Sequence, residues 1–134
     1  MRTSCIAIFL LLLVSLSNAQ IADVLIPAER EREQIIHHKS YSLSYNSSYV
    51  LPSWVAYKVV KSQVNKFEKV KEKYQKDPSI LTRSSEKSDY KEGGYTMAPL
   101  ASYLDIQNYP EWKEEAFYMS NIVPMKPTFY TLIW

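Results

Sequence analysis

Glycine and cysteine are almost absent from this chain of 134 residues. Its two glycines, Gly93 and Gly94, stand side by side. A chain that uses glycine nowhere else needs, at that point, a backbone conformation that side chains disfavour or a very close approach by another group. The single cysteine, Cys5, lies near the N-terminus. A disulfide framework is therefore excluded, and the fold must be held together by its apolar core.

Long hydrophobic runs are also missing, apart from Cys5–Val14. That run is shorter than the roughly 20 residues that a membrane-spanning helix needs. It follows a short basic segment, residues 1–4, and precedes the small residues of Ser17–Ala19. This arrangement predicts a signal peptide over 1–19, cleaved before Gln20, and therefore a secreted or lumenal protein. The remaining 115 residues carry 15 basic and 14 acidic side chains and suit one domain.

Several catalytic motifs do not occur in the sequence. It contains no P-loop, no GxGxxG, no GxSxG and no Cys/His cluster with metal-ligand spacing, which argues against the enzyme classes that use them. The two histidines, His37 and His38, are adjacent at the start of a predicted strand. Adjacent strand residues point to opposite faces, so the pair is not suited to hold one metal ion. We expect a structural or surface role for both.

The first half of the chain predicts an arm followed by a hairpin. Residues 20–36 include the charged run E-R-E-R-E and indicate a solvated arm or a short helix. Alternating polar and large residues after His38 predict a strand to Tyr45, and a second strand is predicted over 54–60, which gives an antiparallel hairpin over 38–60. Asn46 opens the N-S-S turn between them, which is an N-glycosylation sequon.

A helix is predicted over 61–76, where apolar residues recur at helical spacing and Pro78 follows. Further along, we expect a short helix over 111–116 and a buried strand over 117–123, stopped by Pro124. The predicted 61–76 helix is rich in lysine. The lysines form either a nucleic-acid-binding surface or simply the solvated face of a helix; the nucleic-acid-binding candidates are Lys61, Lys66, Lys69, Lys71 and Lys73.

Four blocks of the chain, in the right order, resemble the DNA/RNA non-specific endonucleases, the ββα-metal or His-Me finger nucleases that include endonuclease G. D-Y-K-E-G-G-Y-T-M-A-P at 89–99 is similar to the family's D-Y-x-G-S-G-Y-D-R-G-H-M/L-A-P. F-Y-M-S-N-I-V-P at 117–124 is similar to F-Y-L-S-N-I-x-P. Y-S-L-S-Y-N at 41–46 and P-S-W-V-A-Y at 52–57 resemble two family strands. The resemblance covers residues 38–134 and implies an α+β fold with part of a ββα-metal unit.

The chain departs from the family pattern where the chemistry is expected. The resemblance implies that the D-R-G-H histidine is the general base of Mg²⁺-dependent phosphodiester hydrolysis, yet Thr96 alone stands between Tyr95 and Met97. Threonine does not titrate in the useful range. Aligned without gaps from Pro124, Tyr130 stands at the family's metal-binding asparagine. A phenol is a poor ligand for a hard divalent cation.

These features lead to a secreted, α+β, nuclease-family protein without catalytic activity. The domain is expected over 37–134, nucleic acid is the partner that the family implies, and Mg²⁺ is expected for the family but not bound here. Two alternatives stay open: an active endonuclease represented by an incomplete gene model, and a secreted interaction protein on the inherited scaffold. A last helix is expected to begin near Thr128, with only about two turns, and we expect marginal stability. Because much of the family's C-terminal half has no counterpart here, the face of Phe117 and Ile122 is expected to be partly uncovered, which would favour self-association.

The N-terminal segment and the sequon give a direct prediction. Protein secreted from a eukaryotic host should begin at Gln20 and carry a glycan on Asn46, because a signal peptide is removed and the sequon lies in a turn. Intact-mass measurement before and after glycosidase treatment checks both. Secreted material that retains Met1 would contradict the predicted cleavage, and an unchanged mass after glycosidase would contradict the glycan.

Overall fold

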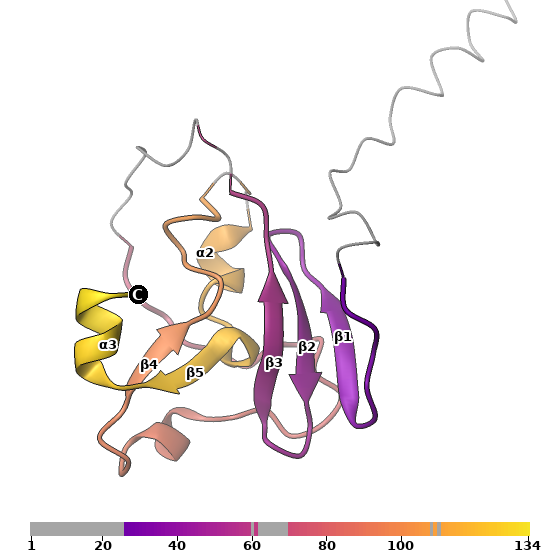
Figure 1. Cartoon of the computed structure of the whole chain (residues 1–134), viewed down its shortest axis with the longest axis horizontal. Helices are drawn as coiled ribbons and strands as arrows, with labels where there is room; N and C mark the ends of the chain where they lie inside the picture. Colours follow the sequence, from indigo (N-terminus) through magenta and orange to yellow (C-terminus); the bar gives the residue numbers. More distant parts are fainter. Residues whose placement is uncertain (1–25, 60, 62–69, 108, 110) are drawn as a thin grey trace, which may run out of the picture.

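The computed structural model describes residues 26–59, 61, 70–107, 109 and 111–134. Its first half is a three-stranded antiparallel sheet in the order β1–β2–β3 (Figure 1). The strands are β1 (Glu33–His37), β2 (Ser42–Asn46) and β3 (Leu51–Ala56). The ladder between β2 and β3 shifts register between Ser44 and Tyr45, which accommodates Pro52 opposite Tyr45.

The second half contains a two-stranded antiparallel sheet and a terminal helix. The strands are β4 (Thr96–Pro99) and β5 (Ile122–Met125), and the helix is α3 (Pro127–Leu132). Figure 1 shows α3 beside this pair of strands, at the end of the long axis opposite β1. Short helical turns lie between the strands; they are η3 (Lys87–Tyr90), α2 (Trp112–Glu115) and η4 (Met119–Asn121). The architecture is α+β, as the sequence predicts.

Aromatic residues supply the largest fully buried side chains of the core. Tyr41, Leu43 and Tyr45 from the first sheet are almost fully buried against Phe117 and other residues around α2. The tyrosines keep their hydroxyls satisfied, since Tyr41 donates to the backbone oxygen of Glu115 at 2.7 Å and Tyr45 donates to that of Arg83 at 3.1 Å. A large tyrosine content can therefore serve as core, because the ring supplies apolar area and the hydroxyl reaches a partner.

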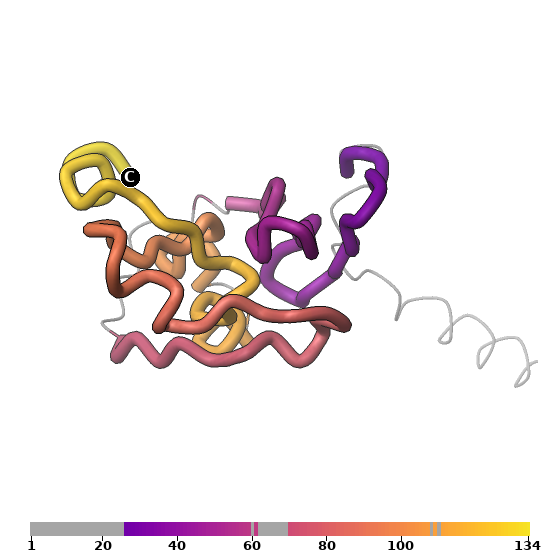
Figure 2. Tube along the Cα trace, turned by 90° about the horizontal axis from the view of Figure 1, so that it is seen from below, coloured from indigo at the N-terminus to yellow at the C-terminus, as the bar shows by residue number. Residues whose placement is uncertain are grey.

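The segment after residue 70 is extended, which corrects the predicted helix over 61–76. Residues 62–69 of that prediction lie outside the described residues, but 70–76 contain no helical turn, and Gln75 forms an isolated parallel bridge to Tyr118. The lysine-rich sequence has helical propensity. The bridge to the backbone of Tyr118 and contacts with the core outweigh that propensity and keep the segment extended. Figure 2 shows this segment running along one side of the molecule, beneath both sheets.

Three further sequence expectations need correction. Residues 33–36, expected within an arm, belong to β1, because Ile36 is buried in the core and Gln34 pairs with Tyr45 in the ladder. The hairpin is consequently the second and third strands of a sheet, and β3 ends at Ala56 rather than continuing to 60. The strand expected over 117–123 begins only at Ile122, after η4, and continues past Pro124. Proline is tolerated there because β5 is an edge strand.

The face of Phe117 and Ile122, expected to be uncovered, is buried: their exposed fractions are 1% and 0%. The exposed apolar side chains of the described C-terminal region lie instead on α3 and just after it, at Phe129, Leu132, Ile133 and Trp134. Among the described residues, no helix is long and apolar enough to span a membrane.

Asp77 joins the two halves of the protein. Its Oδ2 lies 2.9 Å from Nε2 of His38 and accepts a hydrogen bond from Oγ of Ser120 at 2.5 Å, while its Oδ1 accepts from the backbone N–H of Ser79 at 2.8 Å. The residue is 3% exposed. Burial by itself raises the pKa of Asp77, but the bonds to His38, Ser120 and the Ser79 amide outweigh burial and hold the pKa below 3.8.

Substitution of Asp77 by asparagine should destabilise the fold. The change removes the charge and places an amide donor opposite groups that already donate, so we expect a loss of about 3 kcal/mol in the free energy of unfolding. The contribution of Asp77 is present above the unfolded-state pKa and is lost as the pH falls through the lower folded-state value, that is, from about pH 4 downward. The acid limb of the stability curve should therefore flatten in Asp77→Asn.

The matched control is Glu111→Gln, which breaks the exposed ion pair with Lys39 on the surface. This variant should leave the free energy of unfolding nearly unchanged, because a solvated pair contributes little. Urea denaturation of both variants between pH 3 and pH 7 is the measurement. Equal losses in the two variants would contradict the role of Asp77.

Candidate functional site

The glycine pair forms the turn that leads into β4. Gly94 adopts a positive φ of 66°, a conformation that favours glycine. At Gly93 an added Cβ would lie 2.8 Å from Cδ2 of Tyr95, so no larger residue fits without movement of the ring. Gly94 therefore requires glycine for its dihedral angle, whereas a larger residue at Gly93 would displace the exposed ring of Tyr95.

Thr96 is the first residue of β4 and pairs with Met125 of β5. Its side chain is half-buried. A hydroxyl of this kind does not accept a proton from water at neutral pH, so Thr96 cannot be a general base. Thr96, which stands where the resemblance implies the catalytic base, is thus an ordinary strand residue.

Tyr130 lies in the middle of α3 and is half-buried. Burial raises the pKa of its phenol above 10.0, and the negative charge of Glu72 raises it further. The phenol stays protonated at neutral pH, whereas Mg²⁺ prefers carboxylate, carbonyl and water oxygens. The described residues also contain no group of three His, Cys, Asp or Glu side chains placed to hold a metal ion. The donors at this position do not fit Mg²⁺.

The helix of the ββα arrangement is nevertheless in place. Nε1 of Trp134 donates to the backbone oxygen of Pro99 at 3.0 Å, which fastens the end of α3 to the end of β4. Asn121 holds the connection between the strands, because its Oδ1 accepts from the N–H of Ala101 and its Nδ2 donates to the oxygens of Ala101 and Ala116. These bonds hold the strands and the helix together around Thr96 and Tyr130.

The two histidines have structural surroundings. His38 packs between the rings of Tyr41 and Tyr118 and contacts Asp77. His37 is exposed, with Nδ1 3.0 Å from Oγ of Ser42. Neither is part of the β4–β5–α3 unit. The sequence expectation of structural or surface roles agrees with these positions.

The structure describes three of the candidate lysines. Lys61, Lys71 and Lys73 are exposed, and they form no ion pair with another described residue. Lys66 and Lys69 lie outside the described residues. The described lysines are therefore available for an anionic partner, and Lys71 and Lys73 lie in the extended segment rather than on a helix.

Asn46 ends β2, and its Oδ1 accepts from the backbone N–H groups of Ser48 and Tyr49. The sequon thus forms an Asx-turn at the surface. The glycan itself stays a prediction.

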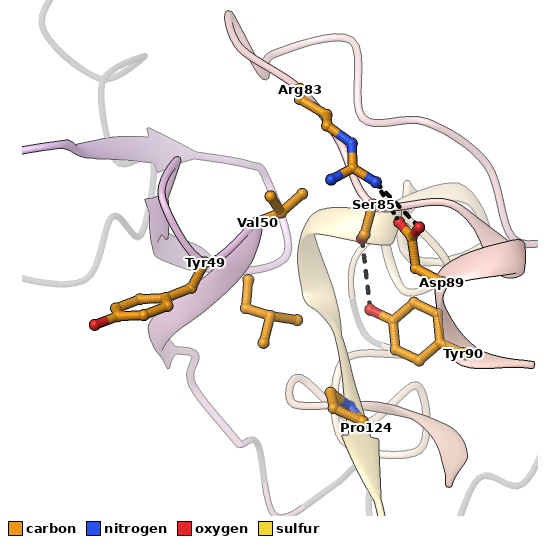
Figure 3. A pocket seen from close by; sticks show the side chains of 8 residues that line it. Tyr49, Val50, Arg83, Ser85, Asp89, Tyr90 and Pro124 are labelled. Carbon is orange, nitrogen blue, oxygen red and sulfur yellow. Dashed lines mark hydrogen bonds and ion pairs between the residues drawn. The ribbon is translucent and has the colours of Figure 1, made fainter. Parts of the chain in front are cut away.

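A cavity of about 330 Å³ lies between the β2–β3 turn and the 83–90 segment. Figure 3 shows the Arg83–Asp89 pair on one side, Val50 opposite, and Tyr90 and Pro124 below. Nη2 of Arg83 donates to both carboxylate oxygens of Asp89 at 3.0 Å. The sequence does not predict this cavity. Of the residues that line it, only Asp89 and Tyr90, the D-Y pair of the family motif, stand out in the sequence.

Comparisons with known proteins agree with this fold. The family profile described as DNA/RNA non-specific endonuclease matches residues 25–134. The chain therefore belongs to the DNA/RNA non-specific endonuclease family. No match was found among curated proteins.

A similar solved structure is a chain of the EndoG/EndoGI complex, a crystal structure that addresses the mechanism of EndoG inhibition. The TM-score is 0.63 and the identity is 26%. The match covers 74% of this chain but 41% of that chain, so this protein corresponds to less than half of its structural relative.

Proposed function

We propose that this protein is a secreted member of the endonuclease family that binds nucleic acid without hydrolysing it. The observation that carries the proposal is the contrast within the β4–β5–α3 unit. The backbone scaffold is held by Asn121 and Trp134, whereas Thr96 and Tyr130 supply neither a base nor a metal ligand. Binding needs only exposed cations, and Lys61, Lys71 and Lys73 provide them.

Binding without cleavage is the first expected outcome. The protein should retard a DNA duplex in a salt-dependent manner, and the double variant Lys71→Gln/Lys73→Gln should lower the slope of log K against log salt by about 2, since each phosphate contact adds roughly 0.9. Supercoiled plasmid with Mg²⁺ should remain uncut. The control Lys126→Gln removes an exposed lysine outside the 58–76 segment and should leave the slope unchanged.

Repair variants test the reason for inactivity. Loss of a general base removes about 10²–10⁴-fold in rate, and loss of the metal removes more. Tyr130→Asn alone, or Asp-Arg-Gly-His in place of Thr96 alone, should therefore stay inactive. Chelator-sensitive nicking by the unmodified protein would contradict the proposal. It would favour the alternative of an active enzyme, and a transcript encoding D-R-G-H would favour an incomplete gene model.

The exposed apolar side chains of α3 favour a second candidate, a protein-interaction role on the same scaffold. Leu132 and Ile133 are 79% and 74% exposed, next to Phe129 and Trp134. Contiguous exposed apolar surface favours association.

Self-association through α3 gives a further prediction. The protein should form dimers or larger species at tens of micromolar concentration, and Leu132→Ser/Ile133→Ser should return it to a monomer because the apolar area is removed. Sedimentation velocity over a concentration series measures this. Leu81→Ser is the matched control, since Leu81 is 85% exposed but lies on another segment. A wild-type protein that stays monomeric throughout would rule out this role for α3.

A further inference from the structure

The outer edge of β1 is the side of the strand that faces away from β2. The N–H of His38 donates to the oxygen of Tyr41 at 2.9 Å, so the backbone groups of His38 point toward β2. Successive residues of a strand direct these groups to alternate sides, and Glu33, Ile35 and His37 therefore direct theirs to the outer edge. Among the described residues, the N–H and C=O groups of Ile35 and His37 have no backbone partner there.

A tight turn connects β1 to the arm before it, residues 26–30, which is irregular and mostly exposed (Figure 1). The N–H of Glu33 donates to the oxygen of Arg30 at 3.1 Å, so Glu31 and Arg32 form a two-residue loop. Arg32 has a φ of 65° whereas Glu31 has a negative φ, which is the pattern of a type II turn. Such turns splay the flanking strands, whereas type I′ turns keep them paired. The turn type therefore explains why a hairpin is begun but the arm stands apart from β1.

The bond that closes the turn also fixes the register of a completed hairpin. In that register Ala28 lies opposite Ile35, and Ile26 lies opposite His37. The N–H and C=O groups on the outer edge of β1 would then be paired with those of the arm. Pro27 falls between the two bonded positions, where its missing N–H would face solvent, so it does not weaken the ladder.

The side chains of the arm suit this pairing. Arg30 lies opposite Glu33, and opposite charges directly across a strand pair are stabilising. Ala28 lies opposite the half-buried Ile35, which gives an apolar pair. Ile26 precedes a proline and is therefore favoured in the extended conformation that a strand requires. The sequence of the arm is thus compatible with a strand although its turn holds it open.

The open and closed conformations are close in free energy. Closing the arm pairs the outer groups of Ile35 and His37 but fixes the backbone of the arm. The entropy lost for each fixed residue is similar in size to the net contribution of one hydrogen bond. Neither conformation therefore dominates.

We propose that the arm, residues 26–30, exchanges between the described open conformation and a closed one in which it forms a fourth strand on the outer edge of β1. The open edge can accept an extended strand of another chain. The closed arm uses the same backbone groups and blocks that addition. The arm is thus a strap that controls access to the edge of β1, and this role does not depend on nucleic-acid binding or on α3.

Hydrogen–deuterium exchange of the backbone amides, followed by NMR on the purified chain, is the test. Ala28→Pro removes the donor to Ile35 in the closed arm. The amides of Ile35 and His37 should then exchange roughly two- to tenfold faster than in the unmodified chain, as expected for one lost hydrogen bond. Glu31→Asn/Arg32→Gly gives the loop a type I′ sequence. It should slow the same amides by about fivefold or more, because the loop residues no longer resist a positive φ.

Glu29→Pro is the matched control, because the N–H of Glu29 faces solvent in the closed arm. Exchange at Ile35 and His37 should match the unmodified chain. The Ile36 amide faces β2 and should keep its exchange rate in every variant, which reports an intact sheet. Equal exchange in the unmodified chain and in Ala28→Pro would overturn the inference. Equal acceleration by the two proline variants, or no slowing by the Asn-Gly loop, would do the same.

Discussion

The buried carboxylate of Asp77 is the constraint on which the rest of the structure depends. It is bonded to His38 between β1 and β2 and to Ser120 in η4, so one side chain connects the three-stranded sheet with the β4–β5–α3 unit. A buried carboxylate is costly unless its oxygens are satisfied. Here both oxygens have partners, and the requirement for those partners fixes the position of the chain at Asp77, directly after the extended 70–76 segment.

The arrangement separates the scaffold of a nuclease from its chemistry. The side chains that hold the backbone, Asn121, Trp134 and the glycine pair, meet geometric demands that the fold imposes whether or not a reaction occurs. Thr96 and Tyr130 have no comparable role in holding the backbone. Their residue types differ from those that the family resemblance implies at these positions, while the turn, the strands and the helix remain. Membership of the endonuclease family is therefore visible in the architecture of this chain.

The parts of the fold that could be predicted from sequence are those with strong local signals. Period-two alternation predicts the β2 strand, and the family resemblance predicts a final helix near Thr128, where α3 begins at Pro127. The strand predicted over 117–123 overlaps β5 only at Ile122 and Val123. The strand at Glu33–His37 was missed because its charged residues indicate a solvated segment, and its place depends on Ile36 reaching the core. The extended course of 70–76 was missed because lysine-rich sequence favours helix, and only the bridge from Gln75 to Tyr118 decides otherwise. The cavity was missed because Val50, Arg83 and Pro124 are distant in sequence.

The prolines of the strands have a consequence for how copies of this protein can meet. Of the five strands, only β2 is flanked on both sides in the described structure, and three of the four edge strands, β3, β4 and β5, contain Pro52, Pro99 and Pro124. Each proline withholds a backbone donor, and Pro99 has its carbonyl taken by Trp134. Such edges are poor templates for strand addition. Growth of a continuous cross-molecule sheet is thereby opposed at most of the available edges, and contact between copies is directed toward side-chain surfaces.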